Sequence, residues 1–191
     1  MKKSFGVLPT GEQTYLYTIS CGGITATVTD LGATLVNVFV PDADGNVVDV
    51  VLGYDNAADY LAGSSFFGAI VGRSANRIKG STFSLGGREY SLTPNEHSNN
   101  LHSGPSFYHT RLWTVTACTD TSISLRLDSP AGDQGYPGNA SIDVTYSLDE
   151  TGGLHIAYDA VCDRDTIFNL TNHSYFNLAG EANTQAAIDQ L

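Results

Sequence analysis

The sequence predicts an all-β protein built as an antiparallel sandwich or barrel. Helical periodicity is nearly absent along the 191 residues. Short runs in which apolar and polar residues alternate recur instead, as expected of strands with one buried face. Gly, Asn, Asp and Pro separate these runs at close spacing, and many short strands joined by such turns are typical of antiparallel sheets.

The first half of the chain contains strands, a hairpin and one short helix in this prediction. Residues 24–29 alternate with period two, and the run 35–40 ends at Pro41. Residues 42–46 form a turn sequence before the run 47–52, so these two runs are expected to pair as a hairpin. A single short helix is expected over residues 56–61.

The second half continues the same pattern. Residues 82–85 and 88–92 are separated by Gly86-Gly87, a linker that supplies the positive φ angles of a tight hairpin. Further strands are expected in four alternating runs, namely residues 113–117, 122–127, 140–148 and 154–160.

The end of the chain resembles the start of another strand. Residues 187–191 alternate, and no turn or polar tail follows them. An unpaired edge strand is unfavourable in a finished β domain. We therefore expect residues 1–191 to be a single domain that forms the N-terminal portion of a longer protein, truncated at its C-terminus.

The composition is that of a globular protein and narrows the possible partners. Hydrophobic residues make up 41% and charged residues 15% of the chain. The net charge of -11 disfavours binding to nucleic acid, whose phosphates would be repelled. No apolar run reaches the length of a transmembrane helix, so no membrane partner is expected.

The cysteines and the N-terminal residues predict the cellular compartment of the protein. Cys21, Cys118 and Cys162 are an odd, widely spaced set, which argues against a disulfide framework and a structural zinc site. We expect them to be small buried residues in a reducing compartment. Lys2 and Lys3 are not followed by the apolar stretch of a secretory signal, so a soluble cytoplasmic protein is expected.

His173 is the first candidate for chemistry. It lies between polar and aromatic residues in the segment 172–177. A histidine there can act as a general acid in a pocket, because imidazole exchanges protons near neutral pH. A buried histidine hydrogen-bonded to Asn172 or Asn177 fits the residues equally well.

His102 lies in a second polar segment, residues 99–104, which can reach a sugar hydroxyl or ring oxygen. Taken alone, an exposed turn is the better interpretation of this segment. His97 is expected to face solvent. His109 and His155 have no polar neighbours in sequence that indicate a site.

Arg73 and Arg77 form the third candidate group. Guanidinium groups carry several donors that hold vicinal hydroxyls or carboxylates, and the amide of Asn76 can both donate and accept. A pair of surface arginines is the alternative. No dinucleotide, P-loop, zincin or serine-hydrolase motif is present, and a metal site is unsupported.

Four segments, in order, resemble those of the aldose 1-epimerases (galactose mutarotases). The segment 72–78 resembles the family's GRxANRI, and 100–104 resembles its N-LHGG. The segment 129–139 resembles its SPDGEEGYPGN turn, and 171–178 its TNHSYFNL. The resemblance implies a large antiparallel β-sandwich of the galactose-mutarotase type, a supersandwich.

The resemblance also implies an activity and the residues that perform it. The family interconverts the α and β anomers of free aldohexoses without cofactor or metal. Its general acid corresponds to His173, its second pocket histidine to His102, and its sugar-binding pair to Asn76 and Arg77. Ser174 and Tyr175 are expected to line the pocket beside the acid.

The chain departs from the family pattern in two respects. Ser103 replaces the first glycine after the pocket histidine. The family's general-base glutamate and a sugar-binding aspartate follow the TNHSYFNL segment, and nothing in residues 179–191 resembles either site. Two alternatives therefore stay open: a non-catalytic sugar-binding β-sandwich, and a hexose-6-phosphate 1-epimerase, which would need more basic residues near its pocket.

Overall fold

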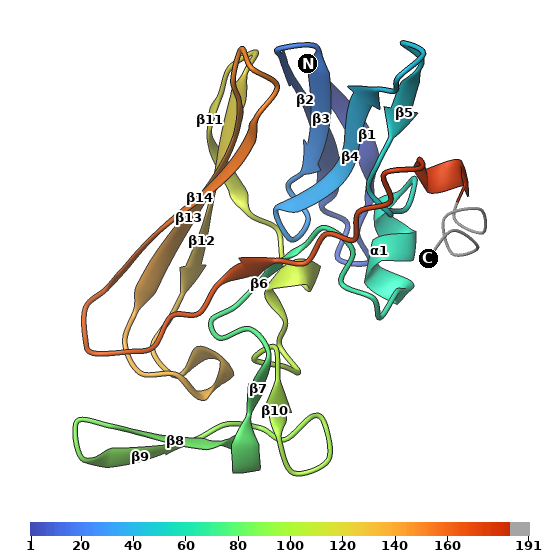
Figure 1. Ribbon diagram of the computed structural model, residues 1–191. Helices are drawn as coiled ribbons and strands as arrows, with labels where there is room; N and C mark the ends of the chain where they lie inside the picture. Colours follow the sequence, from blue (N-terminus) through green and yellow to red (C-terminus); the bar gives the residue numbers. More distant parts are fainter. Residues whose placement is uncertain (184–191) are drawn as a thin grey trace.

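The computed structural model describes residues 1–183, which form two larger antiparallel sheets and three two-stranded ones (Figure 1). The first large sheet has the strand order β1-β2-β3-β4-β5. Its strands are β1 (Lys2–Val7), β2 (Gln13–Cys21), β3 (Ile24–Thr29), β4 (Thr34–Pro41) and β5 (Val47–Asp49). The second consists of β11 (Thr114–Cys118), β12 (Ser122–Ser129), β13 (Ala140–Leu148) and β14 (Leu154–Cys162), in that order.

Short elements join the two large sheets. The strand pairs are β6 (Ile70–Val71) with β15 (Thr171–Asn172), β7 (Arg77–Ile78) with β10 (Asn100–Leu101), and β8 (Thr82–Leu85) with β9 (Arg88–Ser91). The helix α1 covers Ala57–Ala62, and four 3-10 turns cover Lys79–Ser81, Tyr108–Thr110, Asp133–Gly135 and Glu181–Asn183. These results confirm the predicted all-β class.

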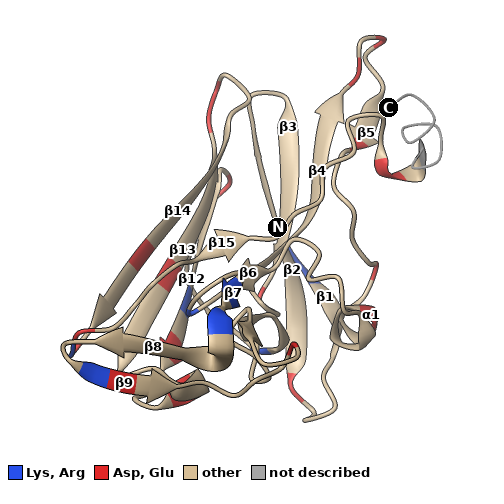
Figure 2. Cartoon of the chain, turned by 60° about the horizontal axis from the view of Figure 1, so that its bottom comes forward, with Lys and Arg blue, Asp and Glu red and all other residues tan. Residues whose placement is uncertain are grey.

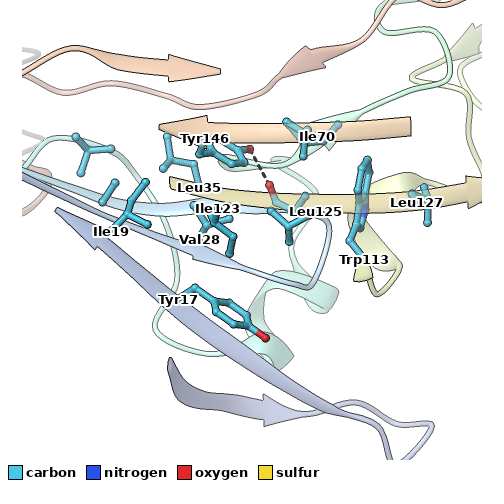
Figure 3. Packing of buried hydrophobic residues seen from close by; sticks show 14 of the residues in the cluster. Tyr17, Ile19, Val28, Leu35, Ile70, Trp113, Ile123, Leu125, Leu127 and Tyr146 are labelled. Carbon is cyan, nitrogen blue, oxygen red and sulfur yellow. Dashed lines mark hydrogen bonds between the residues drawn. The ribbon is translucent and has the colours of Figure 1, made fainter. Parts of the chain in front are cut away.

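The two large sheets pack face to face because their strands alternate. In β13 every second side chain is buried, from Ala140 to Leu148. This inner face meets the inner face of β2–β4 in one hydrophobic cluster (Figure 3). Tyr146 lies fully buried in the cluster and donates a hydrogen bond from its hydroxyl to the Ala33 carbonyl at 2.7 Å, so its polar atom is satisfied.

Local signals in the sequence account for the turns and the helix. Gly86 and Gly87 adopt φ angles of 59° and 76°, as the β8–β9 hairpin requires. The Asn56 side chain caps α1 by accepting a hydrogen bond from the Asp59 amide at 3.0 Å. The predicted helix is therefore confirmed, one residue later than expected.

Three expectations differ from the structure. The run 47–52 is a strand only to Asp49, because the chain then turns to another segment: Val51 bridges to Phe176, and the Leu52 amide donates to the Tyr175 carbonyl. The cysteines are not buried, since Cys118 is exposed and the other two are half-buried. Strands β1 and β2 were not predicted. The strand expected over residues 187–191 lies outside the described residues.

The charged residues are spread widely. Figure 2 shows acidic residues on separate strands and loops rather than in one patch. Within residues 1–183, no helix is long and apolar enough to cross a membrane.

After β14 the chain crosses from the second sheet to the first, as the orange-to-red segment of Figure 1 shows. It pairs with β6 through β15 and then bridges to Val51 through Phe176. The segment 171–178 is therefore held between the two halves of the molecule.

A buried arginine fixes the segment between β6 and β7. Arg73 has no exposed surface, and its guanidinium donates to the Pro137 carbonyl at 2.8 Å and the Ser129 hydroxyl at 2.7 Å. It also donates to the Thr166 hydroxyl at 3.1 Å. This one side chain joins the turn after β12 to the segment after β14.

We expect Arg73→Lys to lower the free energy of unfolding by roughly 2–4 kcal/mol, because a lysine cannot reach acceptors on both sides and leaves some of them buried and unpaired. Urea unfolding followed by fluorescence of the buried Trp113 measures the loss. Arg126→Lys is the matched control. The Arg126–Asp143 pair lies at the surface, so its loss is expected to cost much less than the loss of the buried Arg73 contacts. Equal effects of the two variants would contradict a structural role for Arg73.

Candidate sugar-binding and proton-transfer site

Residues 72–78 lie between two segments that are distant in sequence, one containing Asn169 and the other Leu101. On one side, the Ala75 amide donates to the Asn169 carbonyl at 2.7 Å. On the other side, β7 pairs with β10, which places Leu101 opposite Arg77. The close packing requires Gly72, because a Cβ there would lie 2.4 Å from Leu170 Cδ2 and 2.9 Å from the Tyr108 ring.

These segments line a cleft of about 620 Å³ that brings all the predicted site residues together. The six are Asn76, Arg77, His102, His173, Ser174 and Tyr175. The remaining lining residues in the described part of the chain are Ala75 and the segment 169–172, so none of them is a carboxylate. Residues 1–183 contain no group of three or more His, Cys, Asp and Glu side chains placed to hold a metal ion.

His102 is restrained by two hydrogen bonds to the neighbouring segment. Its Nδ1 accepts the Asn76 amide proton at 3.0 Å, and its own amide donates to the Asn76 carbonyl at 2.9 Å. Because Nδ1 is an acceptor, the neutral ring carries its proton on Nε2. Burial, together with the charge of His173, lowers the pKa of His102 to about 4. His102 is therefore a neutral N–H donor near pH 7.

His173 lies across the cleft from His102. The ring centroids are 5.3 Å apart and the rings nearly perpendicular, at 88°. Two backbone hydrogen bonds hold His173: its amide donates to the Ala69 carbonyl at 2.9 Å, and its carbonyl accepts from the Gly68 amide at 3.2 Å. No residue in the described part of the chain forms a hydrogen bond with its imidazole, so the ring is available to a ligand.

Asn172 anchors the segment that carries His173. Its side-chain amide donates to the Gly68 carbonyl at 2.7 Å and to the Tyr146 hydroxyl at 3.1 Å, and its oxygen accepts from the Ser174 amide. Asn172 therefore ties this segment to the core and does not bond to the His173 ring, contrary to the buried-histidine alternative.

Ser174 and Tyr175 follow His173 in the cleft. The Ser174 hydroxyl is buried and has no hydrogen-bond partner among residues 1–183. Tyr175 is 42% exposed, packs edge-on against Phe67 at 5.3 Å and lies 5.2 Å from the His173 ring. The tyrosine thus forms an open wall of the cleft.

Arg77 is oriented by an ion pair. Its guanidinium donates two hydrogen bonds to Glu96, from Nε at 2.7 Å and from Nη2 at 2.5 Å. Its Nη1 donates to the Asn76 side-chain oxygen at 3.3 Å. The pairing with Glu96 leaves one edge of the guanidinium beside Asn76 in the cleft.

The structure separates the two arginines that the sequence grouped. Arg77 lines the cleft, whereas Arg73 is completely buried and binds the turn after β12. Arg73 is neither a ligand-binding residue nor the surface residue that the alternative interpretation expected. The backbone bends between them, since Asn76 has a positive φ of 61°, so the two side chains serve different parts of the fold.

Two residues near the site were missed in the sequence. Phe66 has a positive φ of 56°, uncommon for a residue with a side chain, and contacts the rings of His102, His109 and His173 at 4.5–5.7 Å. Burial lowers the pKa of His109 to about 4. The aromatic pair Phe66-Phe67 immediately before the 68–78 segment was the available signal. His97 is exposed, as predicted, and His155 is exposed as well.

Known proteins of one family are similar to this chain. The family model described as aldose 1-epimerase matches residues 15–191. Galactose mutarotase from Mus musculus is 42% identical over 178 residues, covering 93% of this chain and 52% of that protein. Aldose 1-epimerase from Escherichia coli K12 is 37% identical over 174 residues, covering 91% and 50%. The chain spans about half the length of these curated relatives.

Solved structures show the same fold. A GalM/aldose epimerase homologue from C. elegans superposes with a TM-score of 0.83 at 38% identity, covering 86% of this chain and 51% of that one. Galactose 1-epimerase from Lactobacillus acidophilus gives a TM-score of 0.81 at 30% identity, covering 93% and 53%. The fold is therefore that of galactose-mutarotase structures, over about half of their length. The matched motifs, fold and sequence together establish that this chain belongs to the aldose 1-epimerase family.

Proposed function

We propose that the cleft is the sugar-binding and proton-donating part of an aldose 1-epimerase active site that interconverts the α and β anomers of free aldohexoses such as galactose and glucose. One observation carries the proposal: two imidazoles face each other in a cleft, and one of them, His102, is held as a neutral hydrogen-bond donor. The family membership and the names of the relatives, galactose mutarotase and aldose 1-epimerase, support the choice of reaction.

In this proposal His173 is the general acid. In its protonated form it donates a proton to the sugar ring oxygen O5 as the bond between C1 and O5 breaks. A positive charge on His173 disfavours a second charge on His102, which is one cause of the lowered pKa of His102. When His173 carries the acid proton, His102 therefore stays neutral and acts as a hydrogen-bond donor.

A general base completes the reaction. A carboxylate removes the proton from the C1 hydroxyl, which gives the open-chain aldehyde. Rotation about C1–C2 and closure on the opposite face give the other anomer, and acid and base exchange roles. No described residue lining the cleft is a carboxylate. We therefore propose that the chain is one domain forming the N-terminal portion of the enzyme, and that the base comes from outside it.

The other lining residues hold the sugar in this scheme. His102 Nε2–H and the free edge of Arg77 donate to sugar oxygens, while the Asn76 side chain both donates and accepts. The Ser174 hydroxyl, which has no hydrogen-bond partner among the described residues, and the exposed Tyr175 supply a further polar contact and an apolar wall. The proton transfers need no metal or organic cofactor.

A non-catalytic sugar-binding sandwich is the second candidate, because the cleft has no carboxylate among its described lining residues. A hexose-6-phosphate epimerase is less well supported. Arg77 is the only Lys or Arg among the described lining residues, and Glu96 already neutralises it.

The reaction is tested by polarimetry of freshly dissolved α-D-galactose, with the intact protein and with the 191-residue chain in parallel. We expect the intact protein to accelerate mutarotation and His173→Gln to lower the rate about 10²–10⁴-fold, as typical for loss of a general acid. His155→Gln is the matched control, because His155 lies on β14, pairs with Asp149 and is exposed. It should leave the rate unchanged.

Three outcomes would revise the proposal. An unaffected rate in His173→Gln removes His173 as the acid. Saturable sugar binding by the intact protein without faster mutarotation indicates the sugar-binding module. Acceleration by the 191-residue chain alone would mean that its own residues supply the base.

His102 also predicts how stability depends on pH. Its folded pKa is lowered to about 4, against roughly 6.5 for an unfolded histidine. Between these values the unfolded chain binds more protons, so the free energy of unfolding should fall as the pH is lowered from 6.5 to 4. Urea unfolding at several pH values should show this fall, and His102→Asn should reduce it. An NMR titration of His102 with a midpoint near 6.5 would contradict the buried, neutral ring.

A further inference from the structure

We propose that Ser103 is a positioning residue whose hydroxyl holds the His102 loop against the segment carrying Asn76 and Arg77, and so sets the geometry in which the sugar is bound. The inference rests on the proposed function, because the geometry concerned is that of the proposed sugar site. Ser103 stands where the resembling family motif has glycine.

The Ser103 hydroxyl is completely buried, and its hydrogen-bonding capacity is fully used. It accepts the Ser74 amide proton at 2.8 Å and donates its own proton to the Ser74 carbonyl at 2.9 Å. The Tyr136 hydroxyl lies 2.9 Å away. Since Ser103 has one proton and gives it to Ser74, Tyr136 donates to Ser103, which fills the second lone pair.

These bonds extend the β7–β10 ladder beyond its last backbone pair. Leu101 lies opposite Arg77 at the end of that ladder. Past this point side chains replace backbone acceptors: His102 Nδ1 takes the Asn76 amide, and Ser103 Oγ takes the Ser74 amide. The two loops that carry the sugar-binding side chains are thus joined through His102 and Ser103 rather than by a regular strand pair.

The backbone conformation is the means by which both side chains reach the neighbouring segment. His102 and Ser103 have φ angles of 55° and 59°, in the left-handed region that favours glycine. A glycine at 103 would adopt this angle more readily but would leave the Ser74 amide and carbonyl and the Tyr136 hydroxyl without this partner. The hydroxyl therefore offsets an unfavourable backbone conformation with three buried hydrogen bonds.

Tyr136 connects this brace to the rigid interior. Its side chain is fully buried, stacks on Phe83 at 5.7 Å and lies 5.6 Å from the Arg73 guanidinium. The turn that carries Tyr136 is the one that Arg73 binds. The His102 loop is therefore held in place by the same buried side chains that fix residues 72–78.

The test compares Ser103→Gly and Ser103→Ala, which both remove the hydroxyl but differ in whether a Cβ remains at a positive φ. In the intact protein we expect both to raise KM for galactose about tenfold, the effect of losing a positioning hydrogen bond, with a smaller change in kcat. By NMR, the Ser74 and Asn76 amides should exchange faster, and the His102 pKa should rise from about 4 towards 6.5.

Ser81→Ala is the control for a merely structural role. Ser81 is another buried serine with a positive φ, 54°, but its hydroxyl donates to the Ser98 carbonyl at 3.0 Å and not to the segments that carry the sugar-binding side chains. Its loss should lower the melting temperature while leaving the His102 titration, the Asn76 amide exchange and KM unchanged. Wild-type KM and His102 pKa in Ser103→Gly would overturn the proposal, as would equal shifts of both quantities in Ser81→Ala. If the wild-type protein binds no sugar, the proposed function fails, and the titration and exchange data still decide whether Ser103 positions His102.

Discussion

The buried guanidinium of Arg73 is the interaction on which the arrangement of the site depends. Burying a guanidinium is costly unless it is hydrogen-bonded, and here both Nη groups donate to acceptors from the turn after β12 and from the segment after β14. Residues 72–78 are therefore fixed relative to both. Since these residues carry Asn76 and Arg77 and run beside Asn169, the same interaction fixes the frame within which both histidines face each other.

Around residues 72–78, the site is held together largely by polar side chains that form hydrogen bonds to backbone groups of neighbouring segments. His102 and Ser103 bond to the backbone of the neighbouring segment, and Asn172 bonds to the Gly68 carbonyl and a buried tyrosine. Each of these bonds is short-range and directional, so the side chains are oriented without regular strands. Such preorganisation reduces the ordering cost of binding a small polar ligand.

The two imidazoles differ in chemistry because their surroundings differ. His102 is half-buried and its Nδ1 is occupied by an amide, whereas the His173 ring has no hydrogen-bond partner among residues 1–183. Burial of the His102 ring and the nearby charge of His173 keep His102 neutral near pH 7. In the proposed reaction, this difference in surroundings lets one ring donate a proton and the other a hydrogen bond.

The sequence by itself determined most of the longer strands and most of the candidate site. Strict alternation located β13, Gly86-Gly87 located the β8–β9 hairpin, and three of the four motifs contain the six predicted residues that line the cleft. Only the tertiary structure decided which arginine is buried, that the strand at 47 ends at Asp49, and that Phe66 and His109 lie beside the histidines. Alternation in the sequence predicts which face of a strand is buried, because successive side chains of a strand point to opposite faces. The partners of Arg73, Ser103 and Phe66 lie dozens of residues away in sequence, so no local pattern identifies them.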